Sequence, residues 1–344
     1  KSLDTAEGKI LFQDYSRNDA DGTWDVYPFT MILKPRQAKP GEAAGPPLIL
    51  RTEKKAKLRF RHGLQFGNSV TDEPNKLEQA QLIGQVEVYQ PGSDRNPKIQ
   101  ITTSNVQVTR RKIFTVSPVA FQFGDHRGSG RNLSIELSHE SINSNLNADF
   151  SNIKGIRRLQ LAYLDFLRLQ PETKPASTPK GTKTLQPEKS PLEITCDGAF
   201  QFDFVRNQAA FRENVVVKQL DPLGDNLVCE KLDLYFNDLA ENPVAPRENE
   251  LLDAKFELRE IVAAGSPAIL SAKSRDSQVQ GEYLRYDLVE NLVEARGGVE
   301  QVEIVQGPNQ FVSQHFHYEI PSDNSLGKLN AFGPGWMVRQ GETV

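Results

Sequence analysis

The chain contains little of what stabilises or anchors many other classes of protein. Two cysteines among 344 residues exclude a disulfide framework. No stretch approaches the roughly 18–20 apolar residues that a membrane-spanning helix needs. Lys and Arg together number 41 and Asp and Glu 45, for a formal net charge of -4. This balance indicates neither a nucleic-acid-binding protein nor a disordered acidic tail.

Apolar residues are also scarce for a chain of this length. Hydrophobic residues make up 38% of the sequence, the mean hydropathy is -0.51, and 2 Trp accompany 18 Phe. At about 150 residues per domain, the length suggests two domains or a single long one. So polar a composition indicates an architecture rich in surface rather than a thick globule.

Catalytic signatures are missing too. The sequence has no G-x-S-x-G, G-x-x-x-x-G-K-[ST], H-E-x-x-H or C-x-x-C motif. Acid pairs such as Asp233 and Asp238 leave a β-helical carbohydrate-active enzyme as the weakest alternative, because its two carboxylates would have to lie about 5–9.5 Å apart across a cleft. We therefore expect a protein that is not an enzyme and uses no cofactor.

What the sequence does contain is alternation of apolar and polar residues in short runs, which is typical of half-buried strands. Each run places its apolar members on one face of a sheet. Examples are Val86/Val88, Ile99/Ile101, Val106/Val108, Val119/Phe121/Phe123, Phe200/Phe202/Phe204, Val215/Val217, Leu232/Leu234/Phe236 and Phe316/Tyr318. Helical patterns are few; residues 73–82, after a Thr71-Asp72 cap, are predicted to form about two turns.

Turn residues and one segment of unusual composition divide the chain. Turns are predicted at Gly128–Gly130 and Gly307-Pro308. Residues 171–191 are rich in Pro, Lys and Thr and almost free of large apolar side chains, so they are predicted to be a linker or a long insertion between strands. We expect one β-roll over residues 1–170 and a second over residues 192–344.

An internal repeat is the most informative pattern. Aligning Asp203 with Asp287 brings about thirty residues into register without a gap. Asn207 falls on Asn291, and both suit a turn with left-handed backbone geometry. Such a unit buries one face only, so copies must stack into a β-roll whose apolar interior suits acyl chains and whose free edges can pair with another strand.

Ordered glycine motifs in and beyond the repeat suggest a family. They are VAAGSPAIL (262–270), QGEYLRYD (280–287), ARGGVEQV (295–302) and AFGPGWM (331–337). In this order they resemble the LptA/OstA-like family of lipopolysaccharide transport proteins. Residues 106–137, with Gly128 and Gly130, are similar to the companion LptC-like family.

The resemblance implies a mainly β fold: an elongated antiparallel β-jelly-roll, or β-taco, of short strands with few short helices. It also implies a periplasmic protein of outer-membrane biogenesis that holds the acyl chains of lipopolysaccharide or a related glycolipid. Its partners would be other β-jelly-roll transport proteins, joined end to end by strand pairing. Whether the chain is a bridge protein, an anchored LptC-like component or a fused version of both, and whether an anchor precedes Lys1, stays open. The alternative is a scaffold that pairs through strand edges and carries no lipid.

The predicted lipid-binding residues are the apolar members of the alternating runs. Each could instead only fill the core of the roll, and in a roll whose interior is the ligand site both roles coincide. They are Phe121, Phe123, Phe200, Phe202, Phe204, Val215, Val217, Leu232, Leu234, Phe236, Phe316 and Tyr318.

Three further features have less specific interpretations. The basic segment Arg51 to His62 could contact lipid phosphates, but a charged edge strand is the favoured interpretation. His315 and His317 share one face of a strand, opposite Phe316 and Tyr318, and we predict no metal there because no third ligand is evident. Cys196 and Cys229 either form a disulfide or are buried as small apolar residues.

Overall fold

The structure is a computed structural model that describes residues 1–4, 8–33, 47–60, 77–90, 99–109, 111–139, 153–170, 190–203, 205–220, 224–236, 258–320, 327–339 and 342–343. Its secondary structure is antiparallel β-strand, which confirms the mainly β fold class. Within these ranges the only helix is the three-residue 3-10 turn η3 (Lys273–Arg275). No helix in the described part of the chain is long and apolar enough to cross a membrane.

The chain divides into two compact units. The described residues of unit 1 fall within Lys1–Tyr163 and Phe200–Gln208, and those of unit 2 within Leu164–Ala199, Ala209–Asn237 and Glu257–Val344. The predicted linker at residues 171–191 lies almost wholly outside the described residues. The division into rolls at residues 1–170 and 192–344 stays a prediction.

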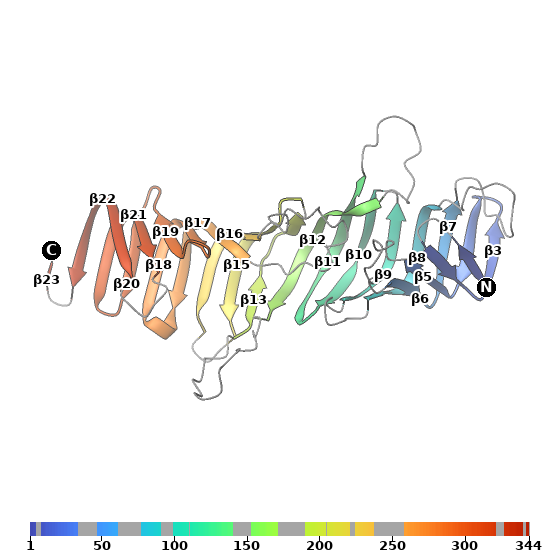
Figure 1. Cartoon of the computed structure of the whole chain (residues 1–344), viewed down its shortest axis with the longest axis horizontal. Helices are drawn as coiled ribbons and strands as arrows, with labels where there is room; N and C mark the ends of the chain where they lie inside the picture. Colours follow the sequence, from blue (N-terminus) through green and yellow to red (C-terminus); the bar gives the residue numbers. More distant parts are fainter. Residues whose placement is uncertain are drawn as a thin grey trace, which may run out of the picture. The chain divides into compact units, whose positions relative to one another are not determined.

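Unit 1 contains the strands drawn from blue to green in Figure 1 and one short yellow-green strand. They are β1 (Ser2–Asp4), β2 (Gly8–Leu11), β3 (Asp14–Asn18), β4 (Thr23–Tyr27), β5 (Phe29–Leu33), β6 (Leu48–Thr52), β7 (Lys55–Phe60), β8 (Leu77–Gln90), β9 (Ile99–Thr109), β10 (Lys112–Phe123), β11 (His126–His139), the first part of β12 (Ile153–Leu169), and β14 (Phe200–Asp203). Most pair with the next strand in the chain, so the unit is built largely from hairpins.

The long strands of unit 1 turn a corner near their middle. Before its corner β8 pairs with β7, and after it β8 pairs with β6, with a register shift between Leu82 and Gln85. Gly84 and Asn105 have positive φ at the corners of β8 and β9, and the Gly84 N–H donates to Asn105 Oδ1 at 3.0 Å. Because each corner sends one strand into two layers, the unit has an inner face between the layers and an outer face.

The apolar core of unit 1 begins at its first strands. We call it the N-terminal core. In it Phe29 and Leu58 are each only 1% exposed, and Trp24 packs against the cluster from outside. Its members are Leu3, Ile10, Phe12, Val26, Phe29, Met31, Ala56, Leu58, Phe60, Leu77, Ala80, Leu82, Val86 and Val106.

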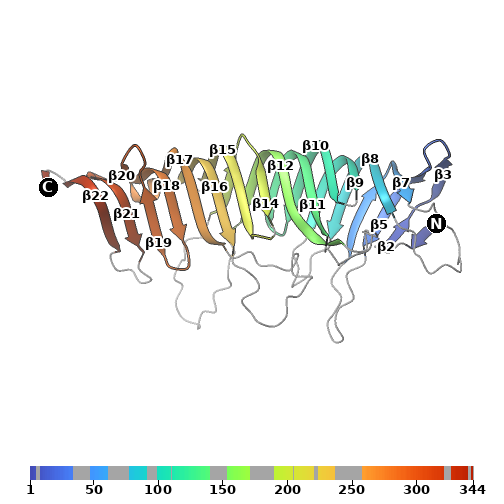
Figure 2. The same ribbon diagram turned by 90° about the horizontal axis from the view of Figure 1, so that it is seen from above.

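Unit 2 contains the rest of β12, one short yellow-green strand, and the strands drawn from yellow to red. They are β13 (Leu192–Thr195), β15 (Gln208–Gln219, whose first residue belongs to unit 1), β16 (Asn226–Phe236), β17 (Leu258–Ala272), β18 (Ser277–Asp287), β19 (Leu292–Arg296), β20 (Val302–Gln306), β21 (Asn309–Glu319), β22 (Lys328–Arg339) and β23 (Glu342–Thr343). Figure 2 shows β15 to β22 side by side in chain order, apart from β19 and β20, which pair with different halves of β18.

The predicted repeat is confirmed in its turns. Asp203 Oδ1 accepts the N–H groups of Val205 and Arg206, and Asp287 Oδ1 accepts those of Val289 and Glu290, at 3.0–3.1 Å. Asn207 and Asn291 then adopt positive φ, as expected. Each of these turns lies within one unit, so one sequence pattern folds the same way in both.

The glycine motifs of unit 2 lie at the corners of its strands. Gly265 to Pro267 fall at the register shift of β17, and the segment after Gly297 separates β19 from β20. A Cβ atom added at Gly297 would come within 2.3 Å of the Glu300 carbonyl oxygen, so no larger residue fits there without a backbone shift. The motifs therefore specify where strands change layer.

Two local predictions are wrong. The helix expected over residues 73–82 is a strand from Leu77 onward, because Leu77, Ala80 and Leu82 pack into the N-terminal core while β8 pairs with β7. The turn expected at Gly128–Gly130 lies inside β11, where both glycines pair with β10. A Cβ atom at Gly130 would lie 2.4 Å from the Tyr163 carbonyl oxygen, so close approach of β12 explains this glycine.

Candidate functional site

The inner face of unit 2 is lined by apolar rows that run across the strands in direct register. Next to the corners, one row is buried; it consists of Leu232, Ala263, Leu284, Ala295 and Phe316. On the other side of the corners Ala268 and Val302 are fully buried as well. Since small and apolar residues are buried on both sides, the two layers face each other through this surface.

Farther from the corners the inner face is only partly covered. We call two rows there the inner ladders. They consist of Ile261, Tyr286, Val293, Tyr318 and Leu329 in one layer, and Leu227, Leu270, Val279, Ile304, Phe311 and Met337 in the other. All are half-buried or exposed, and Leu270 and Leu329 are 37% and 39% exposed. Unit 2 thus has an apolar surface that its own side chains leave open.

Unit 1 has a comparable row that changes along its length. Leu3, Ile10 and Met31 are buried, whereas their register neighbours Leu50, Val88, Ile101 and Phe121 are half-buried. The row is therefore closed at the N-terminal core and partly uncovered toward β10.

The predicted lipid-binding residues belong to these inner faces where the structure describes them. Val215, Leu232, Leu234 and Phe316 are buried close to the corners, and Phe200 is buried opposite Leu161. The others are half-buried; they are Phe121, Phe202, Val217, Phe236 and Tyr318. The side chains of Phe123 and Phe204 lie outside the described residues. The sequence missed the second ladder, since only strand register places Ile304 beside Val279 and Phe311 beside Ile304.

The basic segment after Arg51 is not an edge strand. β7 pairs with β4 on one side and β8 on the other, because its alternate residues Ala56, Leu58 and Phe60 enter the N-terminal core. Its cations form ion pairs on the outer face, including Lys55 with Asp25 at 2.8 Å. Arg61 and His62 lie outside the described residues.

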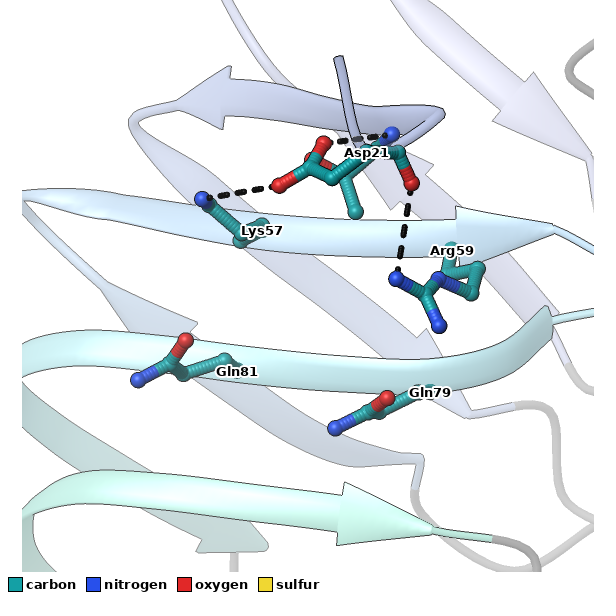
Figure 3. Close-up of a pocket in the computed structure, with 6 residues that line it drawn as sticks. Asp21, Lys57, Arg59, Gln79 and Gln81 are labelled. Carbon is teal, nitrogen blue, oxygen red and sulfur yellow. Dashed lines mark hydrogen bonds and ion pairs between the residues drawn. The ribbon is translucent and has the colours of Figure 1, made fainter. Parts of the chain in front are cut away.

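A shallow polar pocket lies on this outer face (Figure 3). Lys57 is 3.5 Å from a carboxylate oxygen of Asp21, and Arg59 donates to the Asp21 carbonyl oxygen. Hydrogen bonds from Thr23 lower the pKa of the Asp21 carboxyl, with a further contribution from Lys57. The carboxylate therefore offsets part of the charge of the two cations, and the residues that line the pocket are all polar or charged.

The two histidines lie where the sequence placed them, opposite Phe316 and Tyr318, but they have a third neighbour. Glu294 on β19 stands in register with His317 on β21. Its Oε1 is 3.0 Å from His315 Nε2 and 3.4 Å from His317 Nε2. Burial raises the pKa of the Glu294 carboxyl, but hydrogen bonds from Arg296 and both histidines outweigh it and hold the pKa below its ordinary value.

Cys196 and Cys229 are both buried and unbridged, so the structure supports the second of the two alternatives for them. Burial raises the pKa of the Cys229 thiol to about 12 and raises that of Cys196 as well. Both groups are therefore thiols, not thiolates, at neutral pH.

No family model and no curated protein matches the chain. Among solved structures it is similar to LptH from Pseudomonas aeruginosa, described as the LptA homologous periplasmic component of the lipopolysaccharide transport device. The sequence identity is 18% and the TM-score 0.32, over 44% of this chain and 96% of LptH.

Proposed function

We propose that the chain is a periplasmic, non-enzymatic lipid-binding protein that takes part in the transport of lipopolysaccharide to the outer membrane. The observation that carries the proposal is the pair of inner ladders in unit 2, which remain partly exposed beside buried rows on the same face. A face built only as a core would be closed by its own side chains. Acyl chains would cover these ladders.

The energetics favour a flexible apolar ligand. Each methylene removed from water contributes about 0.8 kcal/mol, so about ten methylenes laid along the ladders would contribute up to about 8 kcal/mol before ordering costs. The ladders combine aliphatic side chains with Tyr286, Tyr318 and Phe311, and contain no charged residue. Such a surface suits acyl chains and offers no site for a lipid phosphate.

The proposed ligand contacts extend the residues predicted from the sequence. Phe121 and Phe202 in unit 1, and Val217, Phe236 and Tyr318 in unit 2, would contact acyl chains within their own unit, because they are half-buried. Phe200, Val215, Leu232, Leu234 and Phe316 would support them from beneath.

Strand pairing at the ends of the sheets would supply the protein partners. Among the described residues, β22 pairs with β21 along most of its length and with β23 only through Val338 and Arg339. Phe332 and Trp336 on β22 are each almost half exposed. A second β-jelly-roll protein could add a strand to the remaining edge. Periplasmic location and this class of partner rest on the ordered glycine motifs.

Native mass spectrometry combined with photo-crosslinking tests the proposal. The full chain, purified from cells that make lipopolysaccharide, should carry a glycolipid. A photo-reactive residue at Phe311 or Tyr318 should label it, whereas one at the outward Lys231 or Glu319 should not. Labelling from outward positions alone would contradict the acyl-binding face. Absence of lipid together with concentration-dependent oligomers would favour the lipid-free scaffold.

A further inference from the structure

We propose that Glu294, His315 and His317 form a binding site for a divalent transition metal ion, with zinc as the best fit. The three residues lie on the outer face of unit 2, on the neighbouring strands β19 and β21. Their potential ligand atoms all lie within 4.8 Å of one another. Nothing in the lipid-binding proposal requires this site.

The geometry suits a small metal ion. A tetrahedral zinc with bonds of about 2.0–2.1 Å holds its ligand atoms roughly 3.3 Å apart. Glu294 Oε1 lies 3.0 Å from one imidazole nitrogen and 3.4 Å from the other. Two imidazoles and one carboxylate favour zinc, copper, nickel or iron over calcium and magnesium, which prefer oxygen ligands only.

The surroundings hold the ligands in place. Glu294 is 4% exposed, and its strand position opposite His317 fixes its direction. The centroids of the two imidazole rings are 4.3 Å apart in an edge-to-face arrangement. The centroid of the Phe332 ring lies 5.5 Å from that of His315 and 5.3 Å from that of His317. The site therefore needs little reorganisation of its imidazoles to accept an ion.

One cation competes for the carboxylate. Arg296 donates to Glu294 Oε1 at 2.5 Å, but its side chain is 56% exposed and can turn into solvent. Arg285 is held by Glu260 at 2.6 Å and Asp287 at 3.0 Å, and its nearest approach to Glu294 is 3.9 Å. A metal ion would therefore displace Arg296 and leave the other ion pairs intact.

Titration of the full chain with zinc ion alone, followed by calorimetry, tests the site. Wild type should bind one zinc per chain at this site, and His317→Ala should weaken its binding at least tenfold. The matched control His126→Ala, on β11, should bind as wild type does. Arg296→Ala should bind zinc severalfold more tightly, because it removes the competing cation, and a purely structural role of the cluster would not produce this gain.

A measurement on wild type alone guards against variants that fail to fold. X-ray absorption of the zinc-loaded chain should show two imidazole nitrogens and a carboxylate oxygen in the first coordination shell. Equal zinc affinity in wild type and a folded His317→Ala variant would overturn the proposal, as would a shell without two imidazoles.

Discussion

The N-terminal core of unit 1 and the inner ladders of unit 2 arise from the same alternation of apolar and polar residues, yet one is closed and the other is not. Phe29 and Leu58 are almost fully buried, whereas Ile304, Phe311 and Tyr318 remain partly in contact with water. The difference shows that alternation determines which side chains face inward but not whether that face is filled.

Extra short strands explain the closure. In the N-terminal core, β1, β2 and β5 extend one layer while β3 and β4 extend the other. Aromatic residues close this end of the unit. The ring centroids of Phe12 and Tyr15 are 5.9 Å apart, and those of Tyr15 and Trp24 are 5.6 Å apart. In unit 2 the short strands β19 and β20 lie between β18 and β21, and among the described residues only the two-residue strand β23 follows β22, so the ladders run on to the exposed residues of β22.

Removing one aromatic ring from each region should give the largest difference in stability loss between the two units. Phe29→Ala should lower the free energy of unfolding of unit 1 by about 3–5 kcal/mol, because it leaves a cavity in a closed core. Tyr318→Ala should cost unit 2 less than about 2 kcal/mol, because part of its ring is already hydrated. Urea unfolding followed by the single Trp24 in a Trp336→Phe background, and by Trp336 in a Trp24→Phe background, separates the units. Equal losses would show that the ladder is a closed core.

The sequence could predict the part of this comparison that depends on local pattern. Inward residues such as Val86, Val119 and Phe316, the repeat, and the turns at Asn207 and Asn291 all follow from spacing and residue type. It could not predict the closure of the N-terminal core or the third member of the histidine cluster. Both depend on strand register between segments that are distant in sequence, and a period of two does not determine register.

Thiol reactivity should distinguish the buried residues of unit 2 from those of its partly exposed inner ladders. Cys229 should react with iodoacetamide at pH 8 at least about 100-fold more slowly than a cysteine introduced by Tyr318→Cys. Its pKa of about 12 leaves very little thiolate, and burial limits access. Mass spectrometry of the modified peptides gives both rates in one sample. If Cys229 reacted as quickly as the introduced cysteine, the buried rows would be open too.

A charge placed on an inner ladder should weaken ligand binding about tenfold. Ile304→Asp puts a carboxylate beside Val279 and Phe311 and should weaken the binding of a fluorescent acyl probe. The next residue provides a matched control, because Val305 faces the other side, between Gln278 and Gln310. Val305→Asp should bind the probe as wild type does. Equal loss in both variants, with circular dichroism unchanged, would place the ligand elsewhere.

The smallest expected effect tests whether the low cost of Tyr318→Ala comes from partial exposure of its ring or from low stability of the whole of unit 2. A low cost of Tyr318→Ala would also follow if all of unit 2 were weakly folded. Asp203 in unit 1 and Asp287 in unit 2 make the same turn, with two backbone N–H groups donated to one carboxylate oxygen. Each Asp→Ala variant should therefore lower the stability of its own unit by about 1–2 kcal/mol.

The matched Asp→Asn variants should recover most of that loss, because Oδ1 is retained as an acceptor while the ion pairs to Arg158 and Arg285 weaken. Urea unfolding monitored through the single-tryptophan backgrounds provides the two values. Similar losses of stability at Asp203 and Asp287 would mean that a local defect destabilises unit 2 as much as it destabilises unit 1. The low cost of Tyr318→Ala would then reflect water already present at its ring. A much smaller cost at Asp287 would instead mean that unit 2 is weak throughout, and the partial exposure of its ladders would lose its significance for ligand binding.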